Sequence, residues 1–95
     1  MKLQEYLKEM RLKTGMSQWE VADKLGYSSP QFVSNWERGL SVPPIKTLKA
    51  IAIVYGCDAK ILKDFILEHE LDKKRKDIET KFSKWHMVLP EDGAK

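Results

Sequence analysis

Polar side chains between residues 31 and 35 are the first candidates for chemistry in this chain. Gln31 and Asn35 carry amides, whose donor and acceptor match N7 and N6 of adenine in the major groove of DNA. Ser34 adds a hydroxyl that pairs with any base, and Phe32 is either a contact for thymine methyl groups or a core residue. A spacing of four residues places both amides on one helix face. We interpret Gln31, Ser34 and Asn35 as candidate base readers; the alternatives are a solvated helix surface and, for Asn35, a phosphate contact.

A helix over residues 18–25 is predicted in front of these side chains. Ser17 is a candidate N-cap, and Glu20 three positions later completes a capping box. Gly26 follows the apolar Leu25, and glycine accepts the left-handed conformation that ends many helices.

A second helix, about residues 30–38, is predicted directly after this turn. Ser29 is placed as its N-cap and Pro30 as its first residue, where the missing N–H of proline costs nothing. Val33 and Trp36 fall on one face, which leaves the polar side chains on another. A helix, a glycine turn and a helix with amides at its exposed start are typical of a DNA-reading pair of helices.

A longer set of residues spreads this pattern over residues 7–58. These residues are Leu7, Arg11, Ser17, Gln18, Ala22, Leu25, Gly26, Trp36, Glu37, Arg38, Gly39, Pro43, Leu48, Ala52 and Gly56. In type and order they resemble the lambda repressor/Cro-type helix-turn-helix family, also called the XRE family. The resemblance implies an all-α domain of five short helices, in which the second and third helices bind DNA.

One departure from the family pattern lies in the turn. Between Leu25 and Gly39 the chain has one residue more than the family usually has. We expect the extra residue at Tyr27, Ser28 and Ser29, because an insertion inside a helix would rotate every later side chain by about 100°.

Several further residues are candidates for phosphate contacts or for a structural ion pair. The phosphate candidates are Gln18, Ser28, Ser29, Arg38 and Lys46. For Gln18 the resemblance implies a phosphate contact that also braces the recognition helix, whereas capping or solvation is the alternative for the serines and Arg38. The resemblance also implies a partly buried ion pair between Arg11 and Glu37, which joins the first helix to the end of the third.

Three more helices complete the predicted domain, residues 1–66. A first helix over 2–13 ends at Thr14 and Gly15, and Pro44 is placed to open a fourth helix after the loop. The apolar stripe of the fourth helix is Ile45, Leu48, Ile51, Ala52 and Tyr55. Asp58 is an N-cap for a fifth helix, whose residues Ile61, Leu62, Phe65 and Ile66 are expected to close the core.

Residues 67–95 form a predicted helical extension with a frayed tail at residues 90–95. Its apolar residues are Leu67, Leu71, Ile78, Phe82 and Trp85, with Lys74 interrupting the stripe. Such a stripe either pairs with its copy in a dimer or folds back against the first helix. The sequence favours the dimer slightly and leaves both open.

Composition narrows the class of protein. The net charge of +3 and the pI of about 9.0 agree with nucleic-acid binding but do not establish it. No apolar run is long enough to cross a bilayer or to serve as an export signal, and the single Cys57 fits a reducing compartment, so we expect a cytoplasmic protein.

His69 and Glu70 begin like a zinc-protease motif, but Lys73 occupies the place of its second histidine. We therefore expect no enzyme activity, no metal and no cofactor.

The sequence thus predicts a sequence-specific, DNA-binding transcriptional regulator that acts as a homodimer on an inverted repeat of double-stranded DNA. Its recognition helix, about residues 30–38, would lie in the major groove. The alternative is an antitoxin that neutralises a protein toxin through residues 59–90 and regulates its own operon. A domain that keeps the fold without binding DNA is disfavoured by the polar Gln18, Gln31, Asn35 and Arg38.

Overall fold

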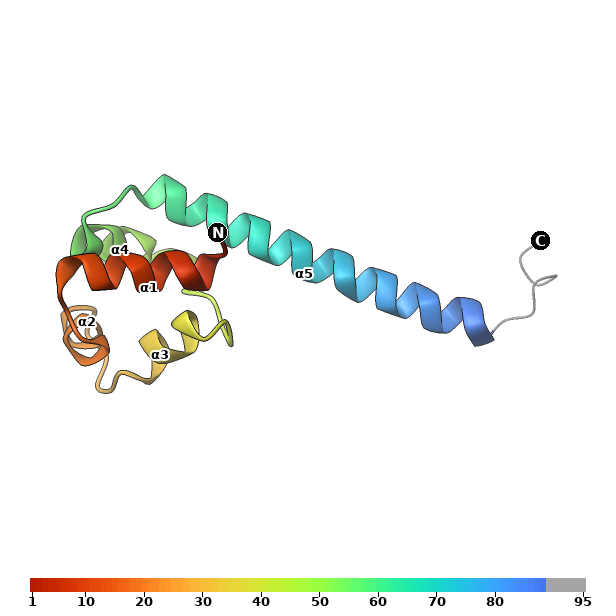
Figure 1. Cartoon of the computed structure of the whole chain (residues 1–95), viewed down its shortest axis with the longest axis horizontal. Coiled ribbons are helices and arrows are strands. Elements are labelled where there is room, and N and C mark those ends of the chain that lie inside the picture. The colour runs from red at the N-terminus through yellow and green to blue at the C-terminus, as the bar shows by residue number, and fades with distance from the viewer. Residues whose placement is uncertain (89–95) are drawn as a thin grey trace.

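The computed structural model describes the backbone of residues 1–88 and the side chains of residues 1–85, and this part of the chain is all-α without a strand. The predicted tail at residues 90–95 lies outside the described residues. The helices are α1 (Leu3–Thr14), α2 (Gln18–Lys24), α3 (Gln31–Glu37), a 3-10 turn η1 (Ile45–Thr47), α4 (Leu48–Tyr55) and α5 (Ala59–Val88). Figure 1 shows a bundle of α1 to α4 from which α5 extends as a long rod. The all-α prediction is confirmed.

Local signals in the sequence set the ends of several helices. The capping box of α2 is formed, because Ser17 Oγ accepts from the Glu20 backbone N–H at 3.0 Å and Glu20 Oε1 accepts from the Ser17 N–H at 2.8 Å. Gly26 follows α2 with a φ of 87°, in the left-handed region that favours glycine. Asp58 Oδ1 accepts from the backbone N–H of Lys60 at 2.9 Å and caps the start of α5.

α3 begins one residue later than predicted. Pro30, expected as the first helical residue, is the N-cap, with φ −78° and a non-helical ψ of 3°. Its carbonyl accepts the first helical hydrogen bond, from the Ser34 N–H at 2.9 Å. Ser29 Oγ contacts the Gln31 N–H at a long 3.4 Å, so it is a weak cap. Gln31 is consequently the first residue of α3.

The prediction for the start of α4 is wrong. Pro44 is extended, with a ψ of 144°, and opens the 3-10 turn η1 instead of an α-helix. α4 itself begins at Leu48, and Ile45, expected in its buried stripe, is 66% exposed. The physical reason lies one residue earlier, where the fully buried Pro43 anchors the loop to the core and turns the following residue outward.

One hydrophobic core joins all the helices of the bundle. Its buried members are Leu3, Leu7, Val21, Ala22, Val33, Trp36, Leu48, Ile51, Ala52, Tyr55, Leu62 and Ile66. α1 lies centrally, in contact with α3, α4 and the first turns of α5. Leu62 and Ile66 close the core as predicted, but Ile61 is 43% exposed and does not. Its position on α5 is one residue away from the face that meets α1 and α4.

α5 does not fold back along α1. It runs without interruption from Ala59 to Val88, about 45 Å at the usual rise per residue. The molecule measures 60 × 25 × 22 Å with a radius of gyration of 18.1 Å, whereas a compact domain of this length has about 12 Å. None of the described helices is both long and apolar enough to cross a membrane.

Candidate nucleic-acid interface

The two helices of the candidate interface pack closely through small and apolar side chains. α2 lies against α3, and Ala22 on α2 is completely buried, as are Val33 and Trp36 on α3. A larger side chain at Ala22 would push the two helices apart, because a packed core has no spare volume. The turn between them contains Tyr27, Ser28 and Ser29, where the extra residue is expected, and both helices are continuous.

The amides of the candidate base readers are hydrogen-bonded to each other. Gln31 Nε2 donates to Asn35 Oδ1 at 2.9 Å across one turn of α3. Gln31 is exposed, whereas Ser34 and Asn35 are half-buried. The bond uses one N–H of Gln31 and the oxygen of Asn35, so the Gln31 oxygen remains an acceptor and both amide nitrogens keep a donor. The structure thus brings two of the three predicted base readers together as one polar unit.

A network of three side chains fixes α3 to α1 and α2. Arg11 Nε donates to Glu37 Oε2 at 2.6 Å and Arg11 Nη2 to Glu37 Oε1 at 2.9 Å. Gln18 Nε2 donates to the same Glu37 Oε1 at 3.0 Å. The side chains of Arg11 and Glu37 are only 10% and 4% exposed. Bidentate pairs between arginine and a carboxylate fix the relative orientation of the two side chains. The C-terminal end of α3 is therefore held firmly in place.

The pKa values of Arg11 and of the neighbouring Tyr55 are both raised at this buried network. Arg11 Nη1 also donates to the Met16 carbonyl at 3.0 Å, and the hydrogen bonds to Glu37 raise the pKa of the guanidinium. Burial, with the negative charge of Glu37, raises the pKa of Tyr55. The Tyr55 hydroxyl is buried without a hydrogen-bond partner among the described residues, and no pattern in the sequence predicts this.

The remaining phosphate candidates are exposed around α3. Ser28 and Ser29 lie in the turn before it and Arg38 directly after it, and Lys46 is in η1 on the loop side. Gln18 differs from these four, because it is half-buried and already bound to Glu37. Its second amide N–H remains a donor for another group.

An aromatic cluster supports the turn and was not predicted. The rings of Tyr27 and Phe32 lie 4.6 Å apart, and Tyr27 meets Trp36 edge-on at 6.0 Å. The sequence left open whether Phe32 is a core residue or a contact for thymine methyl groups. Phe32 is 52% exposed and is therefore not a core residue. The only signal in the sequence was the occurrence of three aromatic residues close to the turn.

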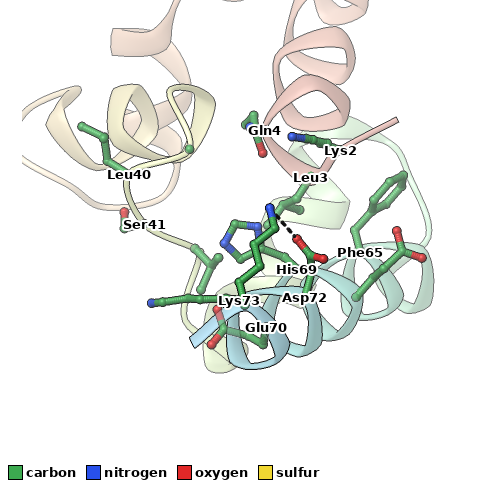
Figure 2. Close-up of a pocket in the computed structure, with 14 residues that line it drawn as sticks. Lys2, Leu3, Gln4, Leu40, Ser41, Phe65, His69, Glu70, Asp72 and Lys73 are labelled. Carbon is green, nitrogen blue, oxygen red and sulfur yellow. Dashed lines mark ion pairs between the residues drawn. The ribbon is translucent and has the colours of Figure 1, made fainter. Parts of the chain in front are cut away.

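A groove lies where α5 leaves the bundle, between the start of α1, the loop after α3 and one side of α5 (Figure 2). Its volume is about 1070 Å³. Its charged lining includes three lysines and three carboxylates, namely Lys2, Lys73, Lys76, Glu68, Glu70 and Asp72. The hydrogen bond from Lys76 lowers the pKa of Asp72. This balance of charge favours neither an anion nor a cation, and the described residues include no group of side chains that could hold a metal ion.

Comparisons with known proteins agree with the geometry of α2 and α3. A model of the helix-turn-helix family matches residues 7–62, which is more than half of the chain and runs from within α1 to the start of α5. Comparisons with curated proteins and with solved structures found no match. The family consists of DNA-binding domains and is not enzymatic. The chain belongs to the lambda repressor/Cro-type (XRE) helix-turn-helix family of DNA-binding regulators.

Proposed function

We propose that this protein is a sequence-specific transcriptional regulator that reads double-stranded DNA with α3 in the major groove. The observation that carries the proposal is the Gln31–Asn35 amide pair, which α3 presents while the Arg11–Glu37–Gln18 network holds that helix rigidly. Rigid placement matters because base readout requires hydrogen bonds of about 3 Å to fixed atoms.

The base contacts are assigned to Gln31, Ser34 and Asn35. The Gln31 oxygen accepts from adenine N6 and its free N–H donates to adenine N7, while the other N–H keeps its bond to Asn35. The amide N–H groups of Asn35 then donate to an acceptor on the neighbouring base. The Ser34 hydroxyl contacts a base of any type, because it can donate or accept. The amide pair therefore favours adenine at one position of each half-site.

Contacts to phosphate are assigned to a ring of residues around α3. These residues are Gln18, Ser28, Ser29, Arg38 and Lys46. Arg38 and Lys46 supply positive charge, the serines supply hydroxyls, and Gln18 uses the N–H that its bond to Glu37 leaves over. Such contacts fix the register of the protein on DNA without reading its sequence.

The biological unit in this proposal is a homodimer on an inverted repeat, with residues 1–66 as the DNA-binding domain and residues 67–95 as an extension. A twofold-symmetric pair places two recognition helices on half-sites about one DNA turn apart. Binding beside a promoter then blocks RNA polymerase, which is the action of a repressor. The proposed location of the protein is the cytoplasm, together with the chromosome that carries its DNA target.

A selection of binding sites from random double-stranded DNA tests this function on the full chain. We expect an enriched inverted repeat with an adenine preference in each half, followed by a matching footprint on the selected sequence. Recovery of random sequences after several rounds, from a folded protein, would contradict sequence-specific binding.

A second candidate function is supported by the exposed distal half of α5. Its apolar side chains, such as Ile78 at 55% exposure, offer a surface by which an antitoxin could hold a toxin. Co-expression with the product of an adjacent gene tests it: the antitoxin role requires that this chain restores growth inhibited by that product and forms a complex with it.

A further inference from the structure

The exposed apolar residues of α5 follow an eleven-residue repeat. Leu67, Leu71 and Lys74 recur eleven positions later as Ile78, Phe82 and Trp85, and we call these six residues the α5 stripe. Eleven residues make just over three full turns, so the stripe stays close to one face from residue 67 to residue 85. Its five apolar members are between 55% and 62% exposed. Five large apolar side chains aligned on one face need a covering surface.

The bundle of the same chain cannot provide this cover. Leu62 and Ile66 are the residues by which α5 meets the core. At about 100° per residue, the α5 stripe lies roughly 140° around the helix from them. The side of the rod that continues toward the bundle carries polar residues such as Lys76 and Thr80. The stripe therefore faces away from its own DNA-binding domain.

We propose that the α5 stripe pairs with the α5 stripe of a second copy, in a parallel and in-register two-helix contact. This inference rests on the proposed function, since it specifies how the dimer on DNA is held together. In this arrangement Leu67, Leu71, Ile78, Phe82 and Trp85 each lie beside the equivalent residue of the second copy. About 27 Å of helix takes part.

The charges beside the stripe favour the parallel orientation. One edge carries Lys63, Glu70, Asp77, Lys81 and Lys84, and the other carries Asp64, Glu68, Arg75 and Glu79. In a parallel pair, each edge faces the other edge of the second copy at the same height. Most facing charges are then of opposite sign: basic against acidic near residue 65, acidic against Arg75 in the middle, and basic against Glu79 near the end. The like-charged neighbours are Glu70 with Glu68 and Asp77 with Glu79.

An antiparallel pair keeps less of this complementarity. Each edge would face itself, which brings Asp77 near Asp77 and Arg75 near Arg75 of the second copy when the apolar residues are aligned, although Glu70 would then lie near Lys81. Like charges at such distances repel. The two DNA-binding domains would also lie at opposite ends of the rod, whereas an inverted repeat requires both recognition helices on the same side of the dimer.

Lys74 is compatible with the parallel pair and helps to define it. Its neighbours one turn away on the same edge are Glu70 and Asp77, so its ammonium group can bend toward carboxylates while its stem covers the seam. A single polar residue in such a seam selects the register and the number of chains. Ion pairs within α5, such as Arg75–Glu79 at 3.8 Å, are exposed and can be redirected at little cost.

Disulfide trapping on the full chain tests the orientation. In a Cys57→Ser background, Leu71→Cys and Ile78→Cys are oxidised separately, with Thr80→Cys on the opposite side of the rod as the matched control. A parallel, in-register pair brings both stripe positions within disulfide range of their own copies. We expect dimers cross-linked at 71 and at 78, and markedly less at 80. Cross-linking at one stripe position and not at the other indicates an antiparallel pair and overturns the proposal.

Charge reversal provides a second test that does not alter the seam. Glu70→Lys places like charges opposite Arg75 in both halves of the dimer, so we expect the dissociation constant of the dimer to rise roughly two- to thirtyfold. Arg75→Glu combined with Glu70→Lys restores opposite signs and recovers part of the loss. Thr80→Lys, on the far side of the rod, is the control for added charge. A double variant that is weaker than Glu70→Lys alone contradicts the assigned edges.

Sedimentation of the unmodified chain separates this inference from the proposed function. A chain that stays monomeric at its highest soluble concentration overturns the inference, and so does a Leu71→Glu variant that dimerises as strongly as the unmodified chain. If that monomer still selects a specific DNA half-site, the proposed function stands alone. A parallel dimer that selects no DNA sequence has the opposite meaning: the stripe is assigned correctly and the DNA-reading role is not.

Discussion

The two halves of α5 contain similar apolar residues but use them differently. In the first half, Leu62 and Ile66 are buried against α1 and α4, and in the second half Ile78 and Phe82 are more than half exposed. Burial of one such side chain contributes about 1.5–3 kcal/mol. The first half therefore stabilises the domain, whereas the second half leaves the same kind of free energy for association. Helical periodicity is shared by both halves, and only the face on which it falls distinguishes them.

Glu37→Ala is expected to have the largest effect, because it removes the partner of a buried charge. Arg11 would remain 10% exposed and without its carboxylate. Breaking such a pair costs about 3–5 kcal/mol, measured as a loss in the free energy of unfolding in urea. Glu79→Ala, which breaks the exposed Arg75–Glu79 pair of the distal rod, is the matched control and should cost less than about 1 kcal/mol. Equal losses in the two variants would remove the difference between the two regions.

Leu62→Ala and Leu71→Ala compare a buried and an exposed apolar position of α5 directly. Leu62 is completely buried and Leu71 is 62% exposed. We expect Leu62→Ala to lower the free energy of unfolding by about 2–5 kcal/mol through lost burial and a cavity. Leu71→Ala should lower it by less than about 0.5 kcal/mol in dilute, monomeric samples. A large loss for Leu71→Ala in dilute solution would mean that the distal stripe supports the domain after all.

Gln31→Ala addresses binding and leaves folding unchanged. We expect a loss of about 1–3 kcal/mol in specific DNA binding and a relaxed preference at one base position of each half-site. Because Gln31 and Asn35 are hydrogen-bonded, the losses for Gln31→Ala and Asn35→Ala should be less than additive in the double variant. Binding titrations and repeated site selection measure both effects. An identical selected motif from variant and parent would exclude Gln31 as a base reader.

Arg38→Ala has the smallest expected effect. Arg38 is exposed directly after α3, so its loss should weaken binding to all sequences alike and reduce the salt dependence of binding by about one unit. Lys84→Ala, near the far end of α5, is the control for a lost positive charge. A salt titration with an unchanged slope in Arg38→Ala would refute the phosphate contact.

Much of the fold could be predicted because its signals are local. The Ser17–Glu20 capping box, the turn at Gly26 and the cap at Asp58 are each formed within a few residues. The apolar periodicity likewise identified Val33 and Trp36 as core residues. Such signals act through backbone hydrogen bonds and helical spacing, which depend little on distant parts of the chain.

Predictions that needed the rest of the molecule were less accurate. The start of α4 depends on how deeply Pro43 is held, so Pro44 was placed in the wrong conformation and Ile45 on the wrong side. The unpartnered hydroxyl of Tyr55 and the stacking of Tyr27 on Phe32 arise between elements and have no local signature. The candidate base readers Gln31 and Asn35 were predicted from their residue types, while their mutual hydrogen bond required the structure.

The sequence by itself determined the helices, the family and the existence of an apolar stripe beyond residue 66. It left open whether that stripe folds back or stays free, because spacing specifies which residues share a face and not what the face meets. The tertiary structure decided this by fixing α5 through Leu62 and Ile66. Once those two residues are in the core, the rigid geometry of the helix carries the stripe to the outer side.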